Sequence, residues 1–108
     1  MFRWEIYTAL VKYEDNPDVC EERPVLIIDK DYVYVLKITS QGHPERQYDV
    51  PIENWIEAGL DKESFVRIDK KLCIPKDDFI KRIGRLDSID IKNITSEYNK
   101  MLKERKQN

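Results

Sequence analysis

Two adjacent β-forming runs, residues 25–28 and 32–38, constrain this chain more than any other feature. The first run is continuously apolar, which is typical of a strand buried on both faces. The second run is rich in β-branched and aromatic residues, and only Asp29-Lys30-Asp31 separates the two. A connection this short joins antiparallel neighbours, so the sequence predicts a β-hairpin. Pro24 is expected at the first position of the hairpin, where a missing N–H is tolerated.

Further strands are predicted on both sides of this hairpin. Period-two alternation and β-favouring residues separated by glycine and proline indicate extended segments at 4–13, 47–50, 64–74 and 80–86. Residues 14–22 form an acidic loop, which is interpreted as a flap between strands or as a simple linker. The expected fold is mainly β, a small and partly open barrel.

Two helices complete the expected fold. Residues 52–58 follow Pro51 and precede Gly59, with apolar side chains at helical spacing, and this predicts a short helix packed through Ile52, Trp55 and Ile56. Asp87 or Ser88 is expected to cap a C-terminal helix. The apolar stripe of that helix consists of Ile91, Ile94, Tyr98 and Met101/Leu102.

Length and composition point to one soluble domain over residues 1–108, with 41% hydrophobic and 37% charged residues. No apolar run approaches the roughly 18 residues that span a bilayer, and residues 1–5 lack the apolar core of a signal peptide, so no membrane association and a cytoplasmic location are expected. Cys20 and Cys73 are expected as free thiols, and with His43 as the single histidine no metal site is predicted.

Charge is unevenly distributed along the chain. Residues 1–58 carry 12 acidic and 6 basic side chains, whereas residues 59–108 carry 9 acidic and 13 basic ones. This split indicates either a half that faces a polyanion or a basic helix with a solvated face. The net charge of −2 lacks the strongly basic character of a duplex-DNA binder, so a small single-stranded target fits better.

Two places along the chain offer chemistry for a phosphate. Arg67 and Asp69 share one face of the strand at 64–70, about 7 Å apart, where a cation can grip a phosphate and a carboxylate can move a proton. The alternative is an ordinary solvated strand face. Arg23 at the start of the hairpin is expected near Thr39 and Ser40 at its end, as an oxyanion site or as ordinary turn chemistry.

Five motifs in order resemble the PemK/MazF family of toxin–antitoxin endoribonucleases. They are Trp-Glu-Ile-Tyr at 4–7, Arg-Pro-Val-Leu-Ile at 23–27, Ile-Thr-Ser at 38–40, Gly-Leu at 59–60 leading to Ser-Phe-Val-Arg-Ile-Asp at 64–69, and Ile-Gly-Arg-Leu at 83–86. The resemblance implies a dimeric Src-homology-3-like barrel of the PemK/MazF/CcdB type that cleaves single-stranded mRNA at a short sequence without metal. A 2′-hydroxyl would attack the adjacent phosphorus, and a cognate antitoxin would inhibit the toxin.

The resemblance also implies roles for individual residues. Arg23 and Thr39 would contact or protonate the scissile phosphate, Asp69 would be the base, and Arg67 its cationic partner. The RNA-binding set consists of Glu5, Ser40, His43 and Arg46.

The chain departs from the family pattern at several positions. Trp4 replaces the family glycine, and the loop before Arg23 is acidic where some members place a histidine. The alternative reading is a non-catalytic toxin of the same barrel class that binds a protein target such as gyrase. A third reading is a general RNA-binding barrel, although no strand face combines aromatic and basic residues.

Overall fold

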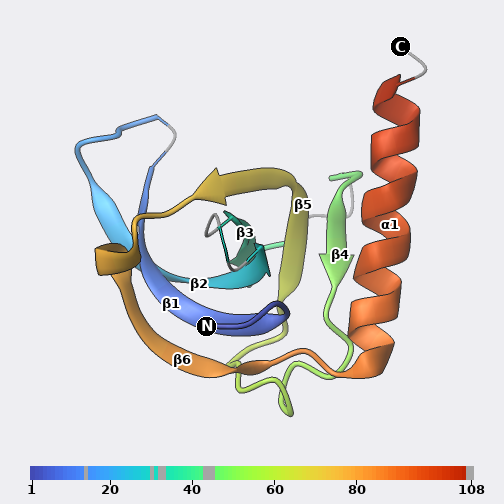
Figure 1. The fold of residues 1–108 in the computed structure, drawn as a ribbon, viewed down its shortest axis with the longest axis horizontal. Helices are drawn as coiled ribbons and strands as arrows, with labels where there is room; N and C mark the ends of the chain where they lie inside the picture. Colours follow the sequence, from blue (N-terminus) through green and yellow to red (C-terminus); the bar gives the residue numbers. More distant parts are fainter. Residues whose placement is uncertain (14, 30, 32–33, 43–45, 107–108) are drawn as a thin grey trace.

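A computed structural model describes residues 1–13, 15–29, 31, 34–42 and 46–106. Six strands precede one long helix in the chain (Figure 1). The elements are β1 (Glu5–Lys12), β2 (Cys20–Asp29), β3 (Tyr34–Thr39), β4 (Asp49–Pro51), β5 (Phe65–Cys73), the 3-10 turn η1 (Lys76–Asp78), β6 (Phe79–Arg85) and α1 (Ser88–Lys106). The predicted hairpin is thus confirmed over residues 25–29 and 34–38, as are the strands expected at both ends of the chain, whereas residues 30, 32 and 33 of the predicted turn and second run lie outside the described residues.

The strands form one antiparallel sheet in the order β4-β5-β3-β2-β1-β6. The sheet curls around itself, with β1 and β6 on one side and β5 arching over the other (Figure 1). The strands β4 and β6 remain as its two edges, so the sheet does not close. This arrangement confirms the expected mainly β, partly open barrel.

The central strands are buried on both faces, as the continuous apolar run predicted. Leu26 and Leu36 belong to a core cluster that includes Ile94 and Met101 from α1. Their neighbours Val25, Ile27 and Val35 point the other way, into a second cluster with Ala9 and Ile74. Alternate side chains of one strand therefore supply two cores, because period two sends them to opposite faces.

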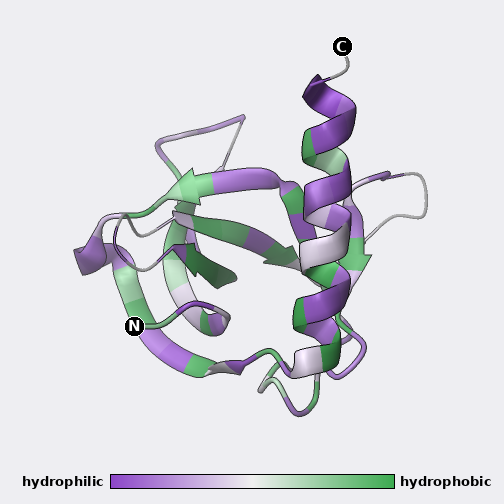
Figure 2. Ribbon diagram, turned by 45° about the vertical axis from the view of Figure 1, so that its right-hand side comes forward, coloured by the Kyte–Doolittle hydropathy of each residue, from purple (hydrophilic) through white to green (hydrophobic). Residues whose placement is uncertain are grey.

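The helix α1 packs against β4 and β5 (Figure 1). The Asp90 N–H donates to Asp87 Oδ1 at 2.9 Å, so Asp87 caps the helix as one of the two predicted candidates. Ile94 and Met101 are buried, whereas Leu102 is 40% exposed at the edge of the expected stripe. Hydrophilic residues dominate the last turns (Figure 2). No helix in the described ranges is long and apolar enough to cross a membrane.

Two predictions around the first hairpin were wrong. The strand β2 begins at Cys20, so Pro24 lies inside it and residues 20–22 are not part of a loop. The β2–β3 ladder ends at Val25, so Pro24 lies just beyond it. Proline is tolerated there because its missing N–H is not needed for pairing with β3. Tyr13 and Val19 close the shorter turn through a backbone hydrogen bond of 3.0 Å.

The predicted helix at 52–58 was also wrong, because the segment is a series of turns. It contains one i→i+4 bond, from the Ala58 N–H to the Asn54 oxygen, whereas a helix needs consecutive ones. The following N–H groups donate at other spacings, from Gly59 to the Ile56 oxygen and from Leu60 to the Trp55 oxygen. The N–H groups of Glu53 and Asn54, at the start of the segment, donate to the Asp90 carboxylate at 2.8 and 3.0 Å. Ile56, expected in the packed stripe, is 67% exposed.

Trp4 adopts φ 73°, the left-handed region that glycine enters most easily. Its N–H donates to the Ile27 oxygen at 2.7 Å, and its own oxygen accepts from the Leu86 N–H at 3.0 Å. The residue that replaces the family glycine therefore keeps the glycine-like conformation and links three distant parts of the chain.

Candidate active site

The candidate site is a pocket of about 480 Å³ where the ends of β1, β2 and β3 meet β5. This volume lies within the range of ordinary ligand pockets. The lining includes Arg23, Thr39 and Arg67, three of the four residues predicted to act on a phosphate. The other lining residues are Val11, Lys12, Tyr13, Asp15, Glu21, Pro24, Lys37, Ile38 and Gln41.

Strand register explains why Arg23 and Thr39 line the same pocket. The β2–β3 ladder ends at the pair of Val25 and Lys37, and Arg23 and Thr39 each lie two residues beyond that last pair, on the same side of their strands as its members. The Thr39 hydroxyl oxygen accepts a hydrogen bond from the Gln41 N–H at 3.1 Å. Because that bond occupies a lone pair, the hydroxyl proton remains to be donated to an anion.

Arg67 reaches the pocket from β5, where it pairs with Lys37 of β3. Its Nε lies 3.6 Å from Asp49 Oδ1, and its side chain is 23% exposed. The Nε atom is buried and has no hydrogen-bonding partner among the residues that the structure describes. Because Arg67 lines the pocket and a guanidinium carries further N–H donors, this side chain can bind an anionic ligand there while its Nε stays beside Asp49.

The pocket is basic although the chain is acidic. Four cationic side chains line it, from Lys12, Arg23, Lys37 and Arg67, against two carboxylates. Of the described residues in the acidic stretch before Arg23, only Asp15 and Glu21 belong to the lining. The pocket can therefore attract a polyanion despite the neighbouring carboxylates.

Glu21 is the carboxylate most closely tied to this pocket. Its Oε2 lies 2.5 Å from Arg23 Nη2, and the two residues share one face of β2 at i, i+2. A hydrogen bond with the Tyr13 hydroxyl lowers the pKa of Glu21, and the same bond raises the pKa of Tyr13. Glu21 is therefore ionised at neutral pH.

Asp69, predicted as the base, does not belong to the pocket lining. Its Oδ2 lies 3.9 Å from Arg46 Nη2, and Arg46 also donates from Nε to Asp49 Oδ1 at 3.3 Å. Asp49 in turn lies beside Arg67, so Asp69 is connected to the pocket through two intermediate side chains. The Asp69 Oδ1 is buried and has no hydrogen-bonding partner within the described part of the chain.

The structure disperses the residues predicted to bind RNA. Glu5 is buried between β1 and β6, where it pairs with Arg82 and accepts the Phe2 N–H at 2.5 Å. Ser40 is exposed and Arg46 faces Asp49 and Asp69, so neither belongs to the pocket lining. His43 lies outside the described residues.

Sequence reasoning missed Tyr13, Glu21 and Lys37 as pocket residues. The signal was present, because Glu21 and Arg23 are two apart and share a strand face if the strand begins before Pro24. Starting the strand at the proline concealed that relation. Within the described ranges, no three side chains of His, Cys, Asp or Glu are arranged to hold a metal ion.

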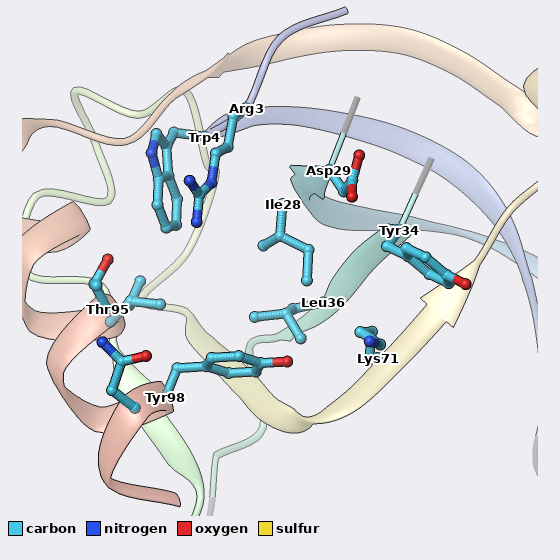
Figure 3. A pocket seen from close by; sticks show the side chains of 11 residues that line it. Arg3, Trp4, Ile28, Asp29, Tyr34, Leu36, Lys71, Thr95 and Tyr98 are labelled. Carbon is cyan, nitrogen blue, oxygen red and sulfur yellow. The ribbon is translucent and has the colours of Figure 1, made fainter. Parts of the chain in front are cut away.

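A second cavity, of about 220 Å³, lies between α1 and the sheet (Figure 3). Ile28 and Leu36 line it together with Tyr98 from the helix. Its two cations rest on aromatic rings, Arg3 over Trp4 and Lys71 over Tyr34, each 4.7 Å from the ring centroid. The residues predicted to act on a phosphate do not line this cavity, so the functional site is assigned to the first pocket.

A half-open antiparallel barrel with two arginines, two lysines and a threonine hydroxyl around one pocket defines a small barrel protein with a basic pocket. Comparison with known families identifies it more closely. The chain belongs to the PemK-like, MazF-like toxins of type II toxin–antitoxin systems, whose family model matches residues 2–102. No curated protein sequence matches the chain.

Solved structures share this fold at low sequence identity. One is an endoribonuclease in complex with its cognate antitoxin from Mycobacterial species, with TM-score 0.70, 15% identity and 94% of each chain covered. Another is the Mycobacterium tuberculosis toxin MazF-mt6, with TM-score 0.65, 22% identity, and 90% of this chain and 96% of the other covered. A third, an endoribonuclease from Mycobacterial species, has TM-score 0.68, 14% identity, and coverages of 94% and 90%.

Proposed function

We propose that this toxin is an endoribonuclease that cleaves single-stranded mRNA at a short sequence without metal. The observation that carries the proposal is the gathering of Arg23, Thr39 and Arg67, from three separate strands, around one basic pocket. Two of the similar structures are described as endoribonucleases, which supports the same activity here. The substrate would be messenger RNA in the cytoplasm.

The proposed reaction is transfer of the phosphoryl group to the neighbouring ribose 2′-oxygen. Arg23 and Arg67 stabilise the negative charge that develops on the phosphate oxygens, and Thr39 donates its hydroxyl proton to one of them. Asp69 as the base stays a prediction, since its carboxylate does not line the pocket.

The proposed partners are a cognate antitoxin and a second copy of this chain. A similar structure is described in complex with its cognate antitoxin, which supports the first partner. A disordered, acidic antitoxin tail that folds over the pocket would compete with RNA for the same four cations.

The test is induced expression of the wild type and of Arg23→Ala, followed by mapping of RNA ends. We expect growth arrest with new 5′-hydroxyl RNA ends in the wild type. We expect neither in Arg23→Ala, because the phosphate loses one of its two guanidinium partners. Lys100→Ala, an exposed change on α1, should behave as the wild type. Purified toxin should cleave RNA equally well in the presence of EDTA.

Arrest with intact RNA would contradict the nuclease proposal and favour a protein target instead. Cleavage by Arg23→Ala at the wild-type rate would show that the protein is a nuclease whose active site is not this pocket.

A further inference from the structure

The carboxylate of Glu21 lies in the pocket with the groups proposed to bind the phosphate. It pairs with Arg23 at 2.5 Å and is hydrogen-bonded to Tyr13, and all three residues line the pocket. This inference rests on the endoribonuclease function proposed above. We propose that Glu21 is the general base that removes the proton from the ribose 2′-hydroxyl of the RNA substrate.

Position is the first requirement for a general base. A guanidinium has five N–H donors, so Arg23 can bind phosphate oxygens while it keeps Glu21 at its side. That phosphate is attached to the 3′-oxygen of a ribose, and the attacking 2′-hydroxyl belongs to the same ribose. A carboxylate that shares the guanidinium with the phosphate therefore lies close to the hydroxyl that must lose its proton.

Protonation state is the second requirement. The hydrogen bond with Tyr13 and the charge of Arg23 keep Glu21 ionised at neutral pH, so its carboxylate is ready to accept a proton. A carboxylate of lowered pKa is a weak base, and its contribution is expected near the lower end of the usual range, at about 100-fold in rate.

The other carboxylates near the site satisfy these requirements less well. Asp69 is outside the pocket lining and faces Arg46. Asp15 lines the pocket, but no ion pair with Arg23 positions it. We therefore assign Asp69 a positioning role, in which it holds Arg46 beside Asp49 and thereby supports Arg67.

The proposed step conserves atoms and charge. The 2′-oxygen bonds to phosphorus as its proton passes to a Glu21 carboxylate oxygen. The bond between phosphorus and the 5′-oxygen breaks, and that oxygen takes a proton from water. The products are a 2′,3′-cyclic phosphate and a 5′-hydroxyl end, and Glu21 returns its proton to the solvent.

The experiment measures kcat and KM for a short fluorogenic RNA across pH, with Glu21→Gln, Glu21→Asp and Asp69→Asn. We expect Glu21→Gln to lower kcat about 100-fold and to remove the fall in kcat at acidic pH. KM should stay the same or decrease, because a negative charge has left the phosphate site. Glu21→Asp should keep part of the rate, and Asp69→Asn should keep the acidic fall in kcat.

Two variants separate base catalysis from loss of charge. Asp18→Asn removes an equal charge from the turn before β2, outside the pocket lining, and Glu22→Gln changes the next residue of β2, which is not in the lining either. Both should keep kcat within about threefold of the wild type. Glu21→Gln should also bind a 2′-O-methyl RNA at least as tightly as the wild type, which shows that it is folded.

Wild-type or faster cleavage by Glu21→Gln would overturn the inference and make Glu21 only a charge that competes with the phosphate. If Asp69→Asn, and not Glu21→Gln, loses the fall in kcat at acidic pH, Asp69 is the base. A wild-type protein that cleaves no RNA would overturn the proposed function, and this inference with it.

Discussion

Glu5 lies in a motif that the family resemblance connects with RNA, yet its carboxylate serves the fold. The residue is 8% exposed, and it accepts hydrogen bonds from Arg82 and from the Phe2 N–H. Burial alone would raise the pKa of Glu5, but these hydrogen bonds outweigh burial and lower it below the ordinary value of 4.5. Glu5 thus joins β1 to β6 at the place where the first and last strands pair.

The lowered pKa of Glu5 predicts a pH-dependent contribution to stability. A carboxylate with a depressed native pKa stabilises the fold above its unfolded pKa and loses that effect as pH falls through the native value. Glu5→Gln should therefore be about 1 kcal/mol less stable than the wild type at neutral pH, and the difference should shrink as pH falls below about 4.5. Urea unfolding from pH 7 to about pH 3 measures both quantities.

The control for this prediction is Glu63→Gln, an exposed substitution outside the β1–β6 pair. Its effect should stay within about 0.5 kcal/mol at every pH. An equally large loss of stability in Glu5→Gln at low and neutral pH would contradict the ionic role of Glu5.

At the scale of elements, α1 organises the segment between β4 and β5 through one buried carboxylate. Asp90 is fully buried and accepts the N–H groups of Glu53 and Asn54 at 2.8 and 3.0 Å. Those groups have no other acceptor in the segment and would otherwise bind water. The first turn of α1 therefore supplies the hydrogen-bond acceptors that the 52–58 segment lacks.

Removing this carboxylate should unfold the protein more easily. Asp90→Ala leaves two partly buried N–H groups without their charged acceptor, and we expect the free energy of unfolding to fall by about 2–4 kcal/mol. Urea denaturation measures the change. Asp77→Ala, at an exposed position in η1, should change it by less than about 0.5 kcal/mol. A loss below about 1 kcal/mol in Asp90→Ala would show that water replaces the carboxylate.

These elements also show what sequence patterns can and cannot locate. The period of the apolar residues and the glycine, proline and capping residues between segments were sufficient to locate β1, β3, β5, β6 and α1, since those signals are local. The 52–58 segment had the right spacing for a helix, but its N–H groups donate at mixed intervals and to Asp90, more than thirty residues away, and side-chain spacing reveals neither. The start of β2 was misplaced because a proline inside a strand is permitted only where one neighbouring ladder has ended, which the sequence does not reveal.

At the scale of the whole molecule, the pocket makes a net-acidic protein locally basic. RNA binding should therefore weaken as salt rises, with a log–log slope of about 0.7 for each phosphate contacted on a single strand. Arg23→Ala should bind a 2′-O-methyl RNA with a slope smaller by about 0.7. Fluorescence anisotropy over a salt series measures this slope.

Lys100→Ala, which removes a cation from α1 outside the pocket, should leave the slope unchanged. Equal slopes for the wild type and Arg23→Ala would show that this guanidinium does not contact a phosphate.

Three of the four side chains predicted from the sequence to act on the phosphate line one pocket, and for Arg23 and Thr39 the reason is strand register. A hairpin fixes which residues face each other, so Arg23 and Thr39 follow from residues 25–38 alone. The location of Asp69 depends on the shift in β3–β5 pairing between Leu36 and Lys37, which places extra residues of β5 opposite one step of β3. Such a bulge has no signature in the period-two pattern.

The bonds of Trp4 to Ile27 and Leu86 bear on how the molecule is made. The first strand finds one of its neighbours only at residues 79–85, more than sixty residues later in the chain. A ribosome must therefore have made and released β6 before that seam can form, and such distant pairing is intrinsically slow. Until then the growing chain lacks its finished barrel, and β1 has only β2 as a neighbour.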